Sequence, residues 1–543
     1  MRNLALGKPY TVTNPVNDAV FLSSERGGPW ADKGGQLTNG KIGPIPMLPG
    51  SWVGFTRQLM RTVTVDLQER DTVQTVTAHF AQDPRAGVTV PVAVTVLGSD
   101  DGASWHLLGT VQSPVAPSAP GPQAVAITWK GKVTARYIRL EFPVAVWALA
   151  SDITVSGIQG PSAQGLPPRL QPAPQPDLGY LSPRAAGGVG SMLLCYLGPL
   201  SPTGPHTWRL TSAQWLPLIA HIGTDSKPDG WFFDSALLLM NGQSAPSGGN
   251  FSGATTRADW SWWLQNLFGL APGGQADTQL PGLQAAVAQA GAVLSDPAHQ
   301  VNVVIAIPYP KPGPSAWAPG VPLQDPAGRL TAVQWFISQT LADWKQADFK
   351  NLHLAGFYWY AESLQPNPGE VGLLQQAAAT IHQDGLRFYW IPYFGATAAT
   401  AWKALGFDGA YLQPNYEFQP TATPQRLTEA AAVARHWGLG LEMELGSLNY
   451  SDESVPRYLT YLNAGAAYGY QGASSAYYDS TQLLLAAAGA AASSPERAVY
   501  DLTYAFVRGS YQAQYVGPGV TLPPFAPIRT PPGIVNALPP TQG

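Results

Sequence analysis

The second half of the chain repeats one pattern, in which an apolar run rich in β-branched and aromatic residues precedes an alanine-rich amphipathic stretch. The eight apolar runs are Met192–Gly198, Gly230–Met240, Val301–Pro310, Leu352–Glu362, Leu386–Phe394, Gly409–Tyr416, Leu439–Gly446 and Ser474–Ser480. The helices predicted between them include Leu330–Lys345, Gly372–Gln383, Thr423–Trp437 and Ser454–Gly465. Eight strand–helix units over about 300 residues predict a (β/α)8 barrel, the α/β fold of the TIM type.

The N-terminal region follows a different pattern, with short alternating strands and no helical stretch. Strands are predicted at Val63–Leu67, Val92–Leu97, Ala124–Thr128 and Arg136–Phe142. This alternation predicts an all-β sandwich of the jelly-roll kind. We therefore expect a multidomain chain with a sandwich over 1–160, a Pro/Gly-rich linker over 161–190, a barrel over 191–516 and a proline-rich tail over 517–543.

Composition narrows the choice of partners. Charged residues make up only 12% of the 543 residues, the net charge is −4 and no basic cluster occurs, so nucleic acid is not an expected partner. The 18 Trp and 22 Tyr suit a polysaccharide or oligosaccharide, because an aromatic face packs on the C–H face of a sugar, although aromatics also fill cores. The single cysteine, Cys195, lies in an apolar run and is expected to be buried and inert.

The sequence also bears on location. No run of 18 or more apolar residues occurs, so no membrane span is expected. The start at Met1 lacks the apolar core of a signal peptide. Because both predicted domains are of extracellular kinds, we expect a secreted or cell-surface bacterial protein whose signal peptide is not part of this sequence.

Three glutamates stand where a barrel of this type carries its chemistry, at the carboxyl ends of strands. Glu362 ends the fourth apolar run, and Glu442 and Glu444 share one face of the seventh. Strands four and seven lie across the barrel mouth, a geometry that can hold two carboxyls about 5 Å apart, as a retaining glycosidase needs. We expect Glu362 to be the acid/base and Glu444 the nucleophile, with Glu442 as its partner or substitute.

Further candidates for contact with substrate lie at or near other strand ends. They are Asp234, Tyr309, Trp359, Tyr360, Trp390, Tyr393, Gln413, Asn415, Tyr416 and Asp479. The amides and hydroxyls among them fit sugar hydroxyls. Each aromatic is equally consistent with packing, Asp234 with a carboxylate bound by backbone groups, and Asp479 with a structural role.

No metal or cofactor motif accompanies these residues. The Gly-x-Ser-x-Gly elbow, the phosphate-binding and dinucleotide loops and the His-Glu-x-x-His motif are all absent from the sequence, and the eight histidines are scattered. We therefore expect chemistry without a metal or an organic cofactor.

An ordered set of motifs carries a family resemblance across the barrel. The motifs are Gly230–Ser235, Ala258–Trp260, Ile305–Pro310, Gly356–Glu362, Trp390–Tyr393, Leu405–Asp408, Gln413–Tyr416 and Leu441–Glu444. In order and content they resemble the bacterial domain-of-unknown-function family 4855, a glycosidase-like barrel family. The acid at strand four and the nucleophile at strand seven also resemble the large clan of retaining (β/α)8 glycoside hydrolases, except that Ala361 stands where that clan usually has Asn.

The N-terminal region carries a second resemblance. Asn3–Pro9, Leu37–Lys41, Val63–Leu67, Ser99–Trp105 and Ala135–Phe142 occur in this order. Together they resemble the coagulation factor 5/8 type C, or discoidin-like, galactose-binding family. The resemblance implies a structural Ca2+ at the turn around Asn39, although the same turn can form without an ion. Trp30 and Trp52, in loops, are the candidates for sugar contact.

These observations favour a glycoside hydrolase that cleaves a bacterial or plant polysaccharide by double displacement with two glutamates. An inverting enzyme that uses Glu362 with another carboxylate, such as Asp234, is the first alternative. The second alternative is a non-catalytic carbohydrate-binding surface or spore-coat protein, since a fold alone does not establish catalysis.

Overall fold

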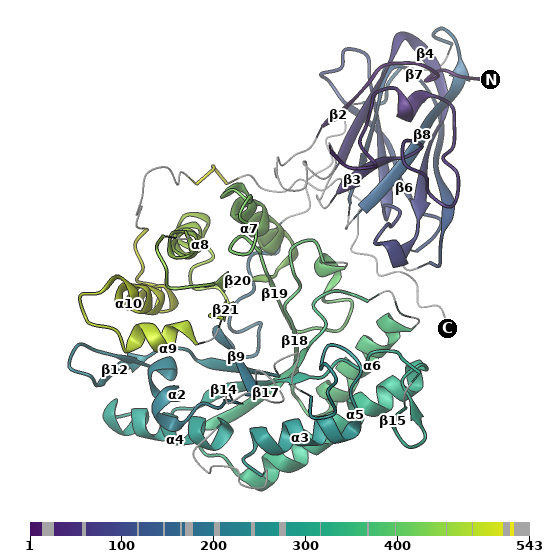
Figure 1. Ribbon diagram of the computed structural model, residues 1–543. Helices are drawn as coiled ribbons and strands as arrows, with labels where there is room; N and C mark the ends of the chain where they lie inside the picture. Colours follow the sequence, from purple (N-terminus) through teal and green to yellow (C-terminus); the bar gives the residue numbers. More distant parts are fainter. Residues whose placement is uncertain are drawn as a thin grey trace.

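The computed structural model describes most of the chain. The described residues are 1–13, 27–56, 61–116, 119–144, 147–162, 165–168, 177–199, 207–240, 245–270, 279–314, 316–365, 367, 369–396, 398–451, 453–480, 482–513 and 522–525. They form an all-β N-terminal domain and a barrel enclosed by helices (Figure 1). The predicted multidomain fold is confirmed.

The N-terminal domain is an antiparallel sandwich. Its strands are β1 (Arg2–Asn3), β2 (Tyr10–Thr13), β3 (Val53–Thr56), β4 (Arg61–Gln82), β5 (Ala93–Ser99), β6 (His106–Gln112), β7 (Gln123–Phe142) and β8 (Trp147–Ile158). They run in the order β1-β8-β4-β7-β5-β6, with β2 beside β4 and β3 beside β8. The short 3-10 helices Gln36–Thr38 and Pro84–Ala86 lie in its loops.

Alternation along two long strands builds the core of the sandwich. Val63, Val65 and Leu67 of β4 are buried, and β7 places Ile138 and Leu140 beside them in register. The register of this pair breaks between Asp66 and Asp71, which lets the long strands bend. The period-two pattern of the sequence therefore marks the buried face.

Eight parallel strands form the closed barrel. They are β9 (Ser191–Pro199), β13 (Ser235–Met240), β14 (Val301–Ile307), β17 (Leu352–Trp359), β18 (Arg387–Trp390), β19 (Gly409–Leu412), β20 (Gly440–Glu444) and β21 (Ser475–Tyr478). Pairing of β21 with β9 closes the ring. Each predicted apolar run coincides with one of these strands. Most strands end earlier than predicted: β17 stops at Trp359, so Glu362 lies just beyond it, whereas β9 extends past its run to Pro199.

Helices surround the barrel (Figure 1). They are α2 (Ser212–Ile219), α3 (Arg257–Leu267), α4 (Gln279–Val293), α5 (Pro326–Ala347), α6 (Glu370–Gln383), α7 (Gln425–Trp437), α8 (Ser454–Tyr468), α9 (Leu483–Ala488) and α10 (Pro495–Val507), with a 3-10 turn at Ala399–Ala401. Smaller pairings add β10 (Thr207–Trp208) beside β9 and the hairpins β11 (Ala220–Ile222) with β12 (Pro228–Trp231) and β15 (Ala316–Ala318) with β16 (Val321–Pro322).

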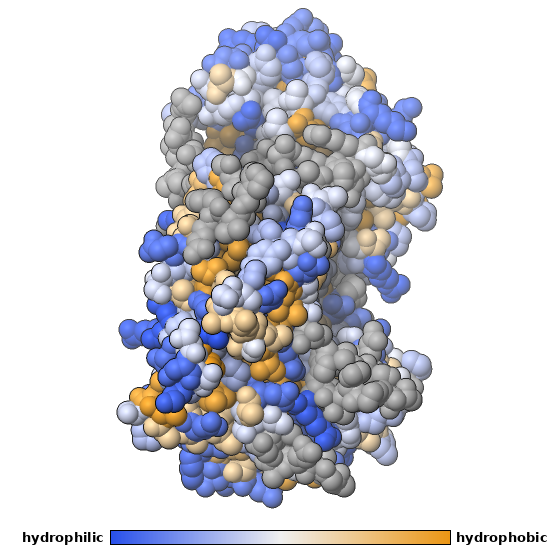
Figure 2. Space-filling view, turned by 60° about the vertical axis from the view of Figure 1, so that its left-hand side comes forward, coloured by the Kyte–Doolittle hydropathy of each residue, from blue (hydrophilic) through white to orange (hydrophobic). Residues whose placement is uncertain are grey.

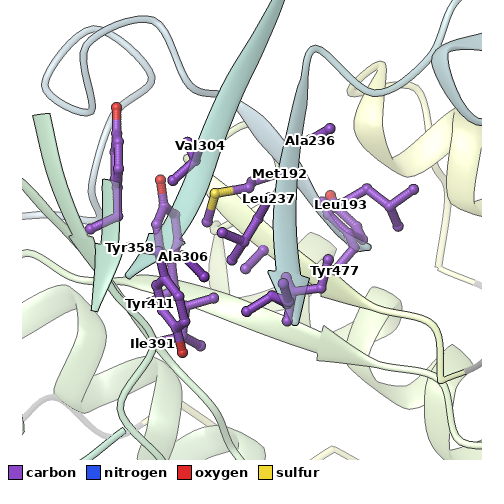
Figure 3. Packing of buried hydrophobic residues seen from close by; sticks show 14 of the residues in the cluster. Met192, Leu193, Ala236, Leu237, Val304, Ala306, Tyr358, Ile391, Tyr411 and Tyr477 are labelled. Atoms are coloured by element: carbon purple, nitrogen blue, oxygen red, sulfur yellow. The ribbon is translucent and has the colours of Figure 1, made fainter. Parts of the chain in front are cut away.

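Side chains from the inward face of the strands fill the barrel. Figure 3 shows Met192, Val304, Ala306 and Tyr358 gathered between their strands. All four are at most 1% exposed. The barrel is thus a packed core and leaves room for chemistry only at its ends.

Part of the predicted linker belongs to the barrel. Residues 177–190 lie across its amino end, where Leu181 donates its N–H to Leu439 and the Tyr389 hydroxyl donates to the Ala186 carbonyl. Leu181, Ala186 and Val189 are buried there. A stretch rich in Pro and Gly still carries enough apolar side chains to cover the barrel floor. At the other end of the chain, Phe525 packs on Tyr468 of α8.

The surface mixes hydrophilic and hydrophobic residues. Figure 2 shows hydrophilic residues spread over one face of the molecule, with hydrophobic residues in small groups. None of the described helices is long and apolar enough to cross a membrane.

Candidate active site

Strand β20 carries two glutamates on the inward face of the barrel. Glu442 lies in register with Ala476, which lies in register with Met192. Residues in register on neighbouring strands point to the same side, and Figure 3 shows Met192 inside the barrel. Glu442 therefore points inward, and so does Glu444, two residues further along.

Glu442 is a buried carboxylate without a compensating partner. It is 3% exposed and makes no hydrogen bond or ion pair with any described residue. Burial raises its pKa well above the ordinary value, and the negative charges of Glu444 and Glu362 raise it further. Glu442 therefore holds its proton more tightly than an ordinary glutamate does.

Glu444 is closed off from solvent, with an exposure of 0%. Its Oε1 accepts a hydrogen bond from Asn415 Nδ2 at 3.2 Å, and its Oε2 accepts one from the hydroxyl of Tyr461 on α8. Burial raises its pKa to about 7, and the hydrogen bond from Tyr461 works against that rise. Two donors thus favour the ionised form of Glu444 over that of Glu442.

The direction of the Tyr461 bond is fixed by its other partners. The Tyr461 oxygen accepts the backbone N–H of Tyr416 at 2.9 Å and that of Glu417 at 3.2 Å. Two accepted bonds occupy both lone pairs of a phenol oxygen. Its one proton is therefore donated to Glu444.

Glu362 faces Glu442 from the end of β17. Its Oε1 accepts a hydrogen bond from the Tyr358 hydroxyl at 3.2 Å. Burial raises the pKa of Glu362, and hydrogen bonds from Gln413 and Tyr358 lower it again in part. Glu362 thus has donors for a negative charge, whereas Glu442 has none among the described residues.

Two amides after β19 connect these carboxylates. Asn415 Oδ1 accepts the Phe394 N–H at 2.9 Å, so its amide group donates to Glu444 and, at 3.1 Å, to Gln413 Oε1. Gln413 in turn donates to the Ile391 carbonyl at 2.9 Å and to Glu362. Asn415 has a φ of 51°, a left-handed conformation that Asn tolerates better than most residues.

Aromatic side chains stand beside the carboxylates. Tyr196 of β9 and Tyr478 of β21 meet edge to face at 6.0 Å, and Phe418 meets Tyr478 at 5.4 Å. Phe418 is 47% exposed. Burial raises the pKa of Tyr196 well above its ordinary value, and Glu362 and Glu442 add to that rise, which brings this tyrosine into the same cluster.

Four of the predicted contact residues reach this region. Gln413 and Asn415 bridge the carboxylates, as described. The Tyr360 hydroxyl donates to the Met240 carbonyl at 3.2 Å, and the charge of Glu362 adds to the rise that burial causes in its pKa. Tyr393 is half-buried and donates its backbone N–H to the Glu362 carbonyl at 3.3 Å.

The two predicted aspartates are bound to the backbone instead. Asp234 lies before β13, at the amino end of the barrel, and accepts the N–H of Gly190 and Ser191 at 3.0–3.1 Å. Asp479 accepts the Leu484 N–H at 3.3 Å at the start of α9. The structure does not bring Asp234 to the three glutamates, because the carboxylate precedes its strand rather than following it.

Four predicted aromatic contacts are packed away from the carboxylates. Trp359 and Trp390 are 1% exposed; Trp359 packs on Tyr309, and Trp390 stacks on Phe407 at 5.0 Å. Tyr309 donates to Glu370, and Tyr416 packs under Arg457 at 4.4 Å. Trp359 and Trp390 follow inward-facing residues by one position, so strand alternation turns them toward the helices.

Several residues of the cluster were not singled out from the sequence. Tyr196 and Tyr358 were detectable, because each alternates with apolar inward-facing residues near the end of its strand. Tyr461 was not detectable, because it lies on α8 and only the packing of that helix brings it to Glu444.

Comparison with known proteins supplies the family. A family model described as "Domain of unknown function (DUF4855)" matches residues 191–505, more than half of the chain. The chain belongs to the DUF4855 family. The DUF4855 region begins with β9 and ends within α10, so it contains the whole cluster. A search of curated proteins finds no match.

Solved structures similar to this DUF4855 protein match about 30% of the chain. A chitosan-binding module from a chitosanase/glucanase of Paenibacillus sp. IK-5 is 18% identical, with 29% of this chain and all of the module covered and a TM-score of 0.20. The C-terminal domain of a chitobiase from Bacteroides fragilis is 17% identical over 29% of this chain and 99% of the domain, with a TM-score of 0.20. A GH29 fucosidase of Ruminococcus gnavus is 14% identical over 30% of this chain and 28% of the fucosidase, with a TM-score of 0.21.

Outside the DUF4855 region, side-chain oxygens at the turn around Asn39 are hydrogen-bonded within the sandwich. Asn39 Oδ1 accepts the Lys41 N–H at 2.7 Å, and the oxygens of Asp152 accept the Gly40 N–H at 2.9 Å and the Thr154 hydroxyl at 2.6 Å. Calcium takes about six to eight oxygen ligands. Asp152 is the carboxylate at this turn, and the described residues hold no cluster of three His, Cys, Asp or Glu.

The sandwich also contains a hollow of about 620 Å³. Gly27, Gly28, Pro29, Trp30, Met47, Ala86, Val88 and Trp147 line it. Trp30 and Trp147 are partly exposed, whereas Trp52 is fully buried and donates its indole N–H to the Pro44 carbonyl. Of the two tryptophans predicted to contact sugar, only Trp30 borders this hollow.

Proposed function

We propose that this DUF4855 protein is a glycoside hydrolase whose barrel uses Glu362 and Glu442 as its pair of carboxylates. The proposal is carried by one observation: Glu442, which points into the barrel from β20, and Glu362, just beyond the end of β17, lie close enough for the charge of Glu362 to raise the pKa of Glu442. Two carboxyl groups in unlike environments are what glycoside hydrolysis requires.

Hydrogen bonding favours particular roles for the two groups. Glu362 accepts bonds from Tyr358 and Gln413, which stabilise a carboxylate. Glu442 has no such donor among the described residues and lies next to two other acids, which stabilises its protonated form. Glu442 then protonates the glycosidic oxygen, and Glu362 attacks the anomeric carbon.

In this proposal Glu444 does not react with the substrate but acts on the pKa of Glu442. Its two donors, Tyr461 and Asn415, keep a negative charge close to Glu442. That charge raises the pKa of Glu442 and so keeps the proton available. The roles predicted from the sequence, with Glu362 as acid and Glu444 as nucleophile, are the alternative within the same reaction.

The test is a screen of purified bacterial and plant polysaccharides for new reducing ends, run with the wild type, Glu362→Gln and Glu442→Gln. We expect at least one polysaccharide to be cut by the wild type only. A 5-fluoro glycosyl fluoride of the sugar released, which keeps the substituent at carbon 2, then traps the covalent intermediate. Peptide mapping should find the label on Glu362; a label on Glu444 supports the other assignment, and an inverted product with no trapped label supports the inverting mechanism.

We propose that the sandwich holds the enzyme on its polymer through the hollow between Trp30 and Trp147. Partly exposed indole rings beside an apolar lining suit the C–H faces of a sugar. Trp147→Ala should weaken retention on the polymer that the barrel cleaves, without changing cleavage of its short oligosaccharides. If the chain binds polysaccharides but never cuts one, the function is carbohydrate binding alone.

A further inference from the structure

The charge of the glutamate cluster has no counterpart in the barrel. Among the described residues, Glu362, Glu442 and Glu444 form no ion pair with Lys, Arg or His. Other acids of the same barrel do have partners: Glu370 pairs with Arg329 at 2.7 Å. Glu442 and Glu444 are almost fully buried, and acids in that position are normally paired, so a cationic group on a ligand would supply a partner that the described residues do not.

Glu442 shows where such a partner binds. Its side chain is 97% buried, yet no described residue offers it a hydrogen-bond donor. A ligand that donates to this carboxyl supplies a hydrogen bond that the described residues do not, and so gains affinity. Tyr196 and Tyr478 lie close to the same glutamates, and Phe418 packs on Tyr478. These rings provide apolar faces for a sugar ring.

We infer that the substrate carries a positive charge at this place, in the form of a sugar unit with a free amino group. This inference rests on the proposed function. An ammonium group supplies three donors and one positive charge, and its hydrogen bonds to carboxylates are stronger than those of a neutral hydroxyl. N-acetylation removes the charge, and a uronic acid brings another negative charge into the cluster.

The positive charge of the substrate's amine also affects catalysis. In the free protein, burial and the neighbouring acids hold the pKa of Glu442 well above its ordinary value. A cation beside Glu362 and Glu444 offsets the effect of these acids and so lowers the pKa of Glu442. General acids work best when their pKa lies near the working pH. The amine of the substrate would therefore both bind to the glutamates and help Glu442 to donate its proton.

Calorimetry with the full chain tests this inference. The probes are oligosaccharides of glucosamine and galactosamine with free amines, their fully N-acetylated forms, and oligogalacturonate. At neutral pH we expect at least one free-amine series to bind at least tenfold more tightly than its acetylated form, and oligogalacturonate to bind weakest. The preference should shrink in acid, because protonated carboxylates no longer attract the amine.

Two variants locate the effect. Glu362→Gln removes one negative charge without changing volume and should reduce the preference at least threefold, whereas binding in the sandwich is unaffected by it. Asp348→Asn, a 73% exposed acid at the end of α5, should leave the preference unchanged.

The outcomes separate the two proposals. If neutral or acidic sugars bind and are cut as well as the free amines, the inference about charge fails and the hydrolase proposal stands. A preference that survives Glu362→Gln also overturns the inference, because the amine is then recognised elsewhere. If no sugar is bound or cut in the barrel, both proposals fail together.

Discussion

Glu442 and Glu370 are both glutamates of the barrel with 3% exposure, and they differ in their partners. Glu370 pairs with Arg329 and accepts from the Tyr309 hydroxyl. Glu442 has only like charges beside it. The isosteric change to glutamine should therefore have opposite effects at the two positions.

For Glu442→Gln we predict a more stable protein at alkaline pH. The folded-state pKa of Glu442 lies well above the ordinary value of 4.5, so the wild type loses stability as the pH rises through that raised pKa. The variant has no such group. Its free energy of unfolding should equal that of the wild type below pH 4.5. At about pH 8 it should be larger by more than about 1.4 kcal/mol, the equivalent of one pKa unit.

Denaturant unfolding across this pH range provides the measurement, with Glu370→Gln as the matched control. That control breaks a buried ion pair and should lose about 3–5 kcal/mol. A Glu442→Gln variant that is less stable than the wild type at alkaline pH contradicts the description of Glu442 as uncompensated.

Tyr461→Phe tests the hydrogen bond that stabilises the charge of Glu444. The change removes the donor to Glu444 and leaves two buried backbone N–H groups without their acceptor. Each loss costs about 1–3 kcal/mol, and the pKa of Glu444 should rise above its value of about 7. Tyr458→Phe, in the same helix, loses only its bond to Thr503 at 2.9 Å and should cost less.

The readout is again unfolding as a function of pH. Only Tyr461→Phe should move the pH at which stability falls, because Tyr458 does not bond to a glutamate. Equal losses with unchanged pH profiles in the two variants mean that Tyr461 is merely packed and does not set the charge of Glu444.

At this scale the sequence predicts the glutamates but not their partners. Glu442 and Glu444 lie at the end of an apolar strand and Glu362 lies just beyond another, and strand order brings the three together. The hydrogen bonds that Gln413 and Asn415 donate to the glutamates depend on the backbone turn after β19. The bond from Tyr461 depends on how α8 packs. Neither follows from residue spacing within one strand.

Strands β17 and β18 approach each other closely at Gly356, in the strand that leads to Glu362. A Cβ at Gly356 of β17 would lie 1.9 Å from the Arg387 carbonyl oxygen of β18. We predict that Gly356→Ala destabilises the barrel by about 1–3 kcal/mol or more, since the strands must separate.

Gly372 of α6 provides the control for this change. A Cβ there meets only Gln376 Nε2, at 3.8 Å. Gly372→Ala should stabilise the protein by about 0.5–1 kcal/mol, because alanine loses less entropy in a helix. Thermal unfolding of the two variants compares them directly; if Gly356→Ala is neutral, the contact between β17 and β18 is looser than described.

The elements themselves follow well from the sequence, whereas their ends do not. Alternation between apolar runs and amphipathic stretches predicts all eight barrel strands. The runs extend past the strand ends because apolar residues also fill the loops that cover the barrel. The Pro/Gly-rich composition of residues 177–190 predicts a linker, yet Leu181 and Val189 are buried against the barrel floor.

The whole molecule is expected to need no calcium. Side-chain oxygens at the Asn39 turn already accept hydrogen bonds from neighbouring groups. We predict that excess Ca2+ or EDTA shifts the unfolding temperature of the full chain by less than about 1 °C, because an ion that does not bind adds no stability. A rise with Ca2+ that saturates, and that Asp152→Asn abolishes, contradicts this prediction.

The central claim is that Glu362 and Glu442 together cleave a glycosidic bond. Its most direct test is the rate of reducing-end release from a cleaved polysaccharide by the wild type, Glu442→Gln and the surface control Asp348→Asn. We predict a loss of about 10²–10⁴-fold for Glu442→Gln, the range for a lost general acid, and an unchanged rate for the control. If the folded Glu442→Gln variant cuts the polysaccharide as fast as the wild type, Glu442 is not the acid and the claim is wrong.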